Sequence, residues 1–118
     1  MSRTQGEILR AALAHLEVAQ SYAARDPDDQ VVVDAICLRL SAAVERLASL
    51  DLAVREEIFG SDWPLMWGMR NRIAHGYELV HADIIRATLS QDVPGIIQSI
   101  RGALGHGDDN ARGDLSEA

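Results

Sequence analysis

The sequence predicts an all-α protein, folded as an antiparallel bundle of four to five helices. Apolar residues recur at helical spacing along most of the chain. The composition is rich in alanine and leucine, and only 4% of the residues are aromatic, which favours helices over a sandwich or a barrel. At 118 residues the chain has the length of a single domain with one modest core. Short links between the periodic segments then favour antiparallel neighbours.

The first two helices are predicted from capping motifs followed by apolar stripes. The first begins at Thr4-Gln5-Gly6-Glu7, which matches a capping box, and its stripe is Ile8, Leu9, Ala12, Leu13, Leu16 and Ala19. The second begins at Asp26-Pro27-Asp28-Asp29, with Asp26 as cap and Pro27 at the first helical position. Its stripe ends near Leu50 and comprises Val33, Ile36, Leu40, Ala43, Val44 and Leu47. The three valines at 31–33 would suit a strand, but the longer helical period predicts a helix.

Two further helices and a last helical segment follow. Asp51 is predicted to cap a short helix that ends at Gly60. The next helix opens at Ser61 or Asp62, accepts Pro64 in its first turn and ends at Gly76. The last segment runs from Ala82 to Leu104 and is interrupted near Asp92-Val93-Pro94, because proline is costly inside a helix. We therefore expect a bundle domain at 1–104 and a flexible acidic tail at 105–118.

Charge and location constrain the partners. The formal net charge is −7, and all eleven basic residues are arginine, which disfavours non-specific binding of nucleic acid but leaves room for a local basic site. The sequence has no apolar run long enough to span a membrane and no basic-then-apolar leader. Its one cysteine, Cys37, fits a reducing compartment and is predicted to be a buried apolar filler. We therefore expect a cytoplasmic protein without a membrane partner.

The stretch MRNRIAHGY, residues 69–77, gathers the most reactive side chains of the chain. Cations and a glycine are common at a helix C-terminus, so part of the pattern is explained as a cap. A cap requires neither Asn71 nor Tyr77. A histidine that titrates near neutrality can act as a general base, and an arginine fork matches phosphate oxygens. His75 and Arg70 thus suffice to cleave RNA without a metal, through attack of the 2′-hydroxyl on the adjacent phosphorus. DNA lacks this hydroxyl and is not an expected substrate.

The spacing of Arg70 and His75 sets a geometric condition on this chemistry. The two residues lie about 140° apart around a helix of ~3.6 residues per turn, so they do not share one face. Either the helix opens before His75, or two chains share one cleft, which favours a two-fold dimer.

The motif resembles a known family. Arg70-x4-His75-x-Tyr77, with Asn71 directly after the arginine, is similar to the signature of HEPN-domain ribonucleases. The longer segment WPLMWGMRNRIAHGYELVHADIIRATLSQDVP resembles the HepT toxin branch. The similarity covers most of the chain, since AICLRLSAAVERL falls where that family has its second helix. One departure concerns that helix, where the family often has a glycine–glutamate pair. This chain has Ala43-Val44-Glu45, which leaves the role of Glu45 open.

The resemblance implies an all-helical homodimer in which both motifs line one cleft. It implies a metal-independent endoribonuclease toxin of a type II toxin–antitoxin pair, with no cofactor. By this resemblance Arg70 and His75 are the catalytic pair, assisted by Asn71. Tyr77 is the hydroxyl that a nucleotidyltransferase antitoxin adenylylates to silence the toxin.

Alternatives remain open from the residues alone. The chain could be a non-catalytic helical partner of a nucleotidyltransferase, which the net charge slightly favours, or a structural dimer whose motif only caps a helix. None of the four histidines has a partner at a ligand spacing such as H-x3-H, so we expect no metal site. Trp63 and Trp67, four residues apart, are predicted to pack in the core or at an interface, with a base-stacking platform as the alternative.

Overall fold

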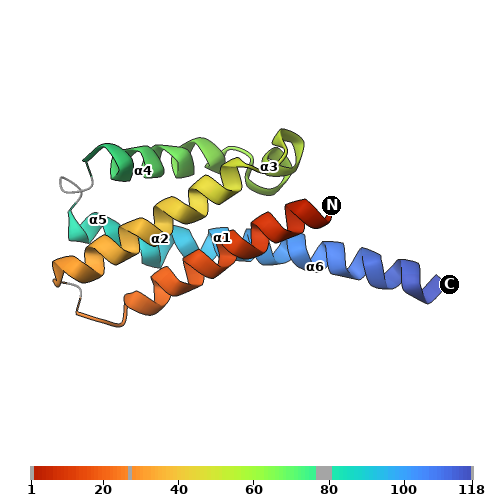
Figure 1. The fold of residues 1–118 in the computed structure, drawn as a ribbon, viewed down its shortest axis with the longest axis horizontal. Coiled ribbons are helices and arrows are strands. Elements are labelled where there is room, and N and C mark those ends of the chain that lie inside the picture. Colours follow the sequence, from red (N-terminus) through yellow and green to blue (C-terminus); the bar gives the residue numbers. More distant parts are fainter. Residues whose placement is uncertain (1, 27, 77–80, 118) are drawn as a thin grey trace.

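Helices make up all of the regular secondary structure that the structure describes. The structure, a computed structural model, describes residues 2–26, 28–76 and 81–117, and of residues 106–117 only the backbone. The elements, shown in Figure 1, are α1 (Arg3–Tyr22), α2 (Gln30–Ala48), α3 (Leu52–Phe59), α4 (Asp62–Gly76), α5 (Ala82–Ala87), the π-helical segment η2 (Thr88–Asp92) and α6 (Val93–Glu117). Because α5, η2 and α6 follow one another without a break, the predicted all-α bundle of four to five helices is confirmed. Among the described helices none is long and apolar enough to cross a membrane.

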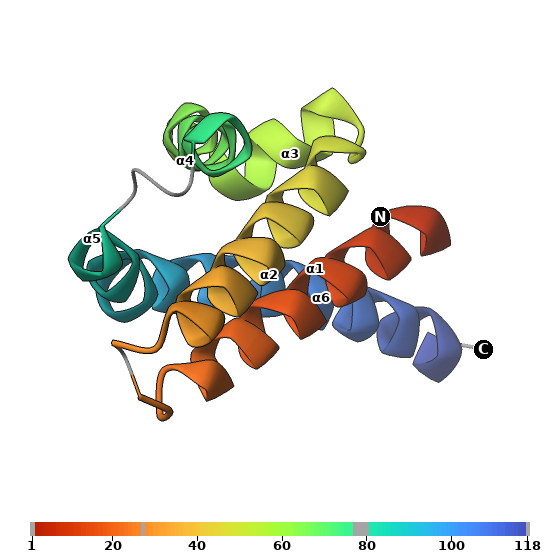
Figure 2. The same ribbon diagram turned by 60° about the vertical axis from the view of Figure 1, so that its left-hand side comes forward.

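The bundle is built around the pair of α1 and α2. These two helices pack along most of their length, α6 packs on α1, and α4 packs on α2. The short α3 joins the two parts through contacts with α4 and α6. Figure 2 shows α4 and α5 as separate bodies, and both contact α2. This arrangement packs α4 on α2, and a groove separates α4 from η2 and the start of α6.

The core consists of the apolar stripes that the sequence predicts. All six stripe residues of α2 are buried, as are five of the six in α1, with Leu13 partly buried. The residues at 31–33 are helical, so the helical period correctly outweighs their strand propensity. The largest fully buried side chains are Leu9, Leu16, Leu40, Leu47, Ile100, Val44 and Val93.

The predicted cap of α1 is wrong. Ser2 is the N-cap, and its hydroxyl accepts a hydrogen bond from the Gln5 backbone N–H at 3.3 Å. Thr4 lies inside the helix, and Glu7 instead forms an exposed ion pair with Arg3 at 3.0 Å. Ser2 and Thr4 both offer a hydroxyl three residues before an acceptor side chain, and the earlier one gains an additional half-turn of helix.

The predicted start of α2 is also wrong. Asp29 is the N-cap, and its carboxylate accepts from the Val31 N–H at 2.9 Å. Asp26 forms a local turn instead, in which its carboxylate accepts from the Asp28 N–H at 3.0 Å. The short aspartate side chain stabilises turns and caps by the same kind of bond, so Asp26 and Asp29 were competing candidates for the cap. The predicted role of Pro27 falls outside the described residues.

The boundaries of α3 and α4 agree with the prediction. Asp51 occupies the N-cap of α3, and Gly60 ends that helix with φ of 51°, a left-handed conformation that glycine adopts without steric cost. α4 begins at Asp62, carries Pro64 in its first turn and ends at Gly76. The Asp51 side chain makes no capping bond. Its backbone N–H donates instead to the side-chain oxygen of the buried Gln5 in α1, at 2.8 Å.

The predicted interruption near Pro94 takes the form of a π-helical turn. In a regular α-helix the ring of Pro94 would clash with the carbonyl of Ser90, four residues earlier. The chain widens at η2 instead, where the Val93 N–H donates to the Thr88 carbonyl, five residues back. The helix therefore continues through the proline rather than breaking. The predicted boundary between bundle and tail at residue 105 lies within α6, and the tail as a separate unit stays a prediction.

Candidate functional site

The last two turns of α4 carry the predicted site residues. Arg70 and Asn71 are partly buried, whereas Arg72 and His75 are exposed. Met66 and Ile73 are the buried residues of this helix and fix its orientation against the core. Tyr77, the predicted modification site, lies outside the described residues.

Arg70 is held by contacts on three sides. Its Nε and Nη2 donate to one carboxylate oxygen of Glu45 in α2, at 3.0 and 2.6 Å. Its Nη1 donates to the side-chain oxygen of Asn71 at 3.1 Å. The guanidinium carbon also lies 5.0 Å from the ring centroid of Trp67, a cation–π distance. An arginine has five N–H groups, so at least two remain for a substrate.

Glu45 therefore has a defined contact that the sequence did not reveal. The side chains of Arg70 and Glu45 are 25% and 50% exposed, and a pair this accessible to water contributes at most about 1 kcal/mol to stability. Its effect is orientation, since a carboxylate that accepts two N–H groups fixes the plane of the guanidinium. A glutamate on the second helix was visible in the sequence, but only the fold shows which basic residue it contacts.

The structure does not bring Arg70 and His75 together within one chain. α4 stays helical through Gly76, so the helix does not open before His75 as one of the two expectations required. The two residues then keep their separation of about 140° around the helix. His75 makes no hydrogen bond or ion pair within the described part of the chain.

The two tryptophans of α4 form part of a stacked row on the surface of α3 and α4. The rings of Trp63 and Trp67 are stacked with centroids 5.9 Å apart. The Arg55 guanidinium lies 4.5 Å from the Trp63 centroid, so an arginine covers each end of the row. Both tryptophans are partly buried against the core, which fits the predicted packing role and leaves little free ring face for a base.

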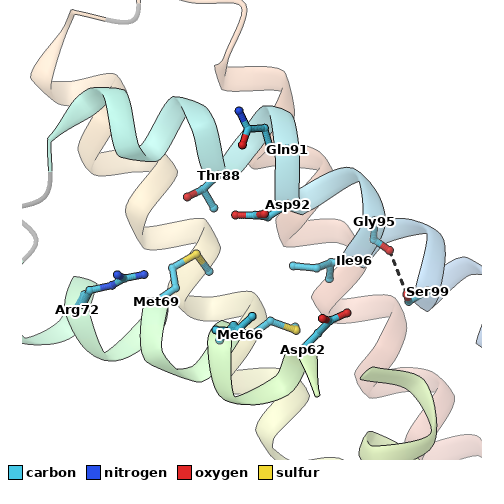
Figure 3. Close-up of a pocket in the computed structure, with 11 residues that line it drawn as sticks. Asp62, Met66, Met69, Arg72, Thr88, Gln91, Asp92, Gly95, Ile96 and Ser99 are labelled. Atoms are coloured by element: carbon cyan, nitrogen blue, oxygen red, sulfur yellow. Dashed lines mark hydrogen bonds between the residues drawn. The ribbon is translucent and has the colours of Figure 1, made fainter. Parts of the chain in front are cut away.

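A groove lies on the other side of α4, between that helix and η2 with the start of α6. Its volume is about 570 Å³. Figure 3 shows Thr88 and Asp92 on one wall, with Met69 and Arg72 of α4 opposite them. No motif in the sequence pointed to this groove, because its two walls come from segments about 20 residues apart.

Two groups away from α4 have shifted pKa values. Cys37 is buried, as predicted. Burial, reinforced by the nearby Asp34, raises the pKa of its thiol, so the thiol stays neutral. Partial burial and the charges of Arg39 and Arg46 lower the pKa of His15. The neutral ring accepts a hydrogen bond from Arg39 through Nδ1 at 3.0 Å. Among the described side chains, no three of His, Cys, Asp or Glu converge as metal ligands would.

The fold and this arginine–histidine helix define a small all-helical bundle protein with a polar motif at the end of one helix. The family model described as Ribonuclease HepT-like matches residues 8–102. This is more than half of the chain, and the chain belongs to that family. No curated protein and no solved structure matches the chain.

Proposed function

We propose that the protein is a metal-independent endoribonuclease and the toxin of a type II toxin–antitoxin pair. The observation that carries the proposal is the state of Arg70, a guanidinium oriented by Glu45 and Asn71 with N–H groups to spare. It lies five residues before the exposed His75 on the same helix, in a chain of the Ribonuclease HepT-like family. A helix cap would not require a glutamate from another helix to orient this arginine.

The proposed reaction is an internal transesterification. His75 takes the proton of the 2′-hydroxyl, the freed oxygen bonds to the adjacent phosphorus, and the bond from phosphorus to the 5′-oxygen breaks. The 5′-oxygen takes up a proton from water, His75 returns its proton to solvent, and a 2′,3′-cyclic phosphate remains on the other fragment. Arg70 stabilises the negative charge that develops on the phosphoryl oxygens. Asn71 holds Arg70 through the bond to Nη1. The reaction requires no metal or cofactor, because the base and the cation are both side chains.

RNA cleavage by purified full-length variants tests this proposal. His75→Ala and Arg70→Ala should each lower cleavage by at least about a hundredfold, since removal of a general base or of an electrostatic stabiliser has effects of this size. Cleavage by the unmodified chain should persist in excess chelator and leave cyclic phosphate ends. Arg101→Ala is the matched control, because this arginine pairs with Glu17 between α1 and α6. Full activity of His75→Ala would rule the mechanism out, and tight nucleotidyltransferase binding without any cleavage would favour the non-catalytic partner.

The proposed regulation rests on Tyr77 and on the partner that the family resemblance implies. A nucleotidyltransferase antitoxin would attach AMP from ATP to the Tyr77 hydroxyl, with release of pyrophosphate. Tyr77 follows His75 by two residues, so the added phosphate would bring negative charge to the cationic end of α4 and compete with RNA. Intact mass after incubation with the antitoxin, ATP and Mg²⁺ should increase by AMP units, and Tyr77→Phe should show no increase. A modified Tyr77→Phe protein would show that the antitoxin uses another residue.

A further inference from the structure

Arg72, rather than Arg70, is the arginine that shares a face of α4 with His75. The two are three residues apart, which places them about 60° from each other around the helix, against about 140° for Arg70 and His75. Arg72 is exposed and makes no hydrogen bond or ion pair with any side chain that the structure describes. The charge of Arg70, in contrast, is compensated by Glu45 at 2.6 Å. Among the residues that the structure describes, Arg72 is thus the arginine without a counter-ion that lies nearest to His75 on the helix.

Arg72 lies at one end of the groove between α4 and η2 with α6. Figure 3 shows its side chain beside Met69, with Asp62 toward the opposite end of the groove. Met66, Met69 and Ile96 give this groove an apolar lining between the two charged ends. Its volume of about 570 Å³ falls within the range of about 300–1,000 Å³ that small-molecule sites occupy.

The wall opposite α4 is polar, and it comes from the π-helical segment. Thr88, Gln91 and Asp92 are three of the five residues of η2, and all three line the groove. The Thr88 hydroxyl donates to the Ile84 carbonyl at 2.9 Å, so its lone pairs are available as acceptors. Gln91 and Asp92 have no hydrogen-bond partner among the described residues. π-Helical turns often occur at functional sites, and this one faces the helix that carries the motif.

We propose that the groove is a subsite for one nucleotide of the RNA strand, with Arg72 binding its phosphate and the wall of η2 reading its base. The proposal rests on the ribonuclease function above. The charges set the orientation, because Asp62 and Asp92 would repel a phosphate that Arg72 attracts. The base lies on the methionine thioethers, and its edge meets Gln91 and Asp92. A carboxylate accepts hydrogen bonds but donates none, so the subsite favours a base with an exocyclic amino group over uracil.

Binding of single-stranded RNA to a cleavage-deficient chain tests the phosphate contact. The probes are fluorescent oligo(C) and oligo(U) of about 12 nucleotides, on the scale of a single-strand binding site, and the full-length His75→Ala chain is the parent. Adding Arg72→Ala should weaken binding of both probes by a similar factor, up to about tenfold, and reduce the slope of log affinity against log salt by about 0.7. Arg25→Ala is the matched control, because Arg25 is an exposed arginine of the α1–α2 link whose side chain has no described partner. It should change neither quantity.

The base contacts have a separate signature. On the same parent, Gln91→Ala and Asp92→Asn should reduce the preference for oligo(C) over oligo(U) at least about threefold without reducing the salt slope, because they touch the base and not the phosphate. Circular dichroism would check that every variant keeps its helices.

The outcomes separate this inference from the proposed function. Cleavage by the wild-type chain together with binding that is indifferent to Arg72 and η2 would overturn the subsite and leave the ribonuclease intact. Absence of cleavage together with Arg72-dependent binding would overturn the ribonuclease function and leave the subsite as an RNA-binding groove. If Met69→Lys changes the molecular mass in light scattering and leaves RNA binding unchanged, the groove holds a second copy of the chain, and the subsite is overturned. Absence of RNA binding by the parent overturns it as well.

Discussion

At the scale of single residues, the guanidinium of Arg70 contacts three side chains of the site. Glu45 comes from α2, Asn71 is the next residue of α4, and Trp67 lies one turn earlier on the same helix. An arginine side chain loses much rotamer entropy when it is fixed. Contacts that fix it before the substrate arrives therefore reduce the entropy cost of substrate binding. Glu45 therefore has two opposed effects, since it orients the cation and also competes with phosphate for it.

Substitutions of Glu45 separate these two effects. Glu45→Gln keeps an oxygen acceptor for Arg70 and removes the negative charge, so we expect kcat near the wild-type value and a lower KM for RNA. Glu45→Ala removes both, so kcat should fall by about tenfold or more because Arg70 loses its orientation. Steady-state cleavage kinetics measure both parameters. Equal kcat values for the two variants would show that Glu45 does not position Arg70.

His15 makes stability depend on pH. Its pKa is lowered in the folded chain by burial and by Arg39 and Arg46, whereas in the unfolded chain it is about 6.5. Below about pH 6.5 the unfolded chain therefore binds this proton first, and stability falls as the pH drops toward the folded pKa. His15→Gln keeps an acceptor for Arg39 and should lose less stability between about pH 7 and about pH 5.5 in urea unfolding. The exposed His81→Gln is the control. An unchanged pH dependence in His15→Gln would contradict this account.

The residue types of the site were predictable from the sequence, but their partners were not. Arg70, Asn71 and His75 were visible because polar residues cluster before Gly76. That Glu45 meets Arg70, 25 residues away, depends on how α2 crosses α4, and no local pattern encodes a crossing. The pairing of Arg72 with the groove depends in the same way on the position of η2.

At the scale of elements, the start of α3 is stabilised from another helix. Its N-cap residue, Asp51, makes no capping bond with its own side chain. The buried amide of Gln5 in α1 accepts from the Asp51 N–H at 2.8 Å instead. α1 thereby fixes the start of α3, and α4 follows α3 in the chain. Gln5, which is far from the motif in sequence, therefore helps to position the motif.

Gln5→Ala should destabilise the fold by about 1 kcal/mol, because the Asp51 N–H loses its acceptor in a partly buried hydrogen bond. Gln30→Ala is the matched control, since the Gln30 amide donates to Asp34 in an exposed bond within α2. Urea unfolding of both variants measures the difference. Similar losses for the two variants would mean that the Gln5 bond to α3 adds nothing beyond an ordinary surface contact.

Element boundaries were predictable where a single residue decides them. Glycine ends both α3 and α4 as expected, because few other residues end a helix at so little steric cost. Boundaries were mispredicted where several caps compete, as with the aspartates before α2. Pro94 indicated that the helix could not continue as a regular α-helix. Both a helix break and a π-helical turn relieve the clash of the proline ring with the preceding turn, and tertiary packing decides between them.

At the scale of the whole molecule, one chain presents Arg70 and His75 on different sides of a straight helix. We therefore predict a two-fold dimer in which Arg70 of one chain acts with His75 of the other. Light scattering at micromolar concentration should give about twice the chain mass of 12.9 kDa. The sequence spacing already indicated that either the helix opens or two chains share the site. The structure of a single chain does not show the second chain.

Mixing two inactive variants tests the shared site directly. Arg70→Ala still supplies His75, and His75→Ala still supplies Arg70, so a hybrid dimer contains one complete pair only if the pair spans two chains. Random exchange makes about half of the dimers hybrid with one of two sites intact, which gives about a quarter of the wild-type cleavage. No recovery after verified subunit exchange would place both residues of each pair in a single chain.

The π turn also limits how the length of the chain can change. From Ile85 to Ile97 the buried residues Leu89 and Val93 recur at every fourth position, and each such step overshoots a regular helical turn by about 40°. The wider turn at η2 absorbs this drift, so the apolar stripe faces the core both before and after it. One further residue inserted beside the exposed Ser90 would rotate everything downstream by about 100° and turn Val93 and Ile97 out of the core. This segment should therefore accept a new side chain at Ser90 far more readily than an added residue.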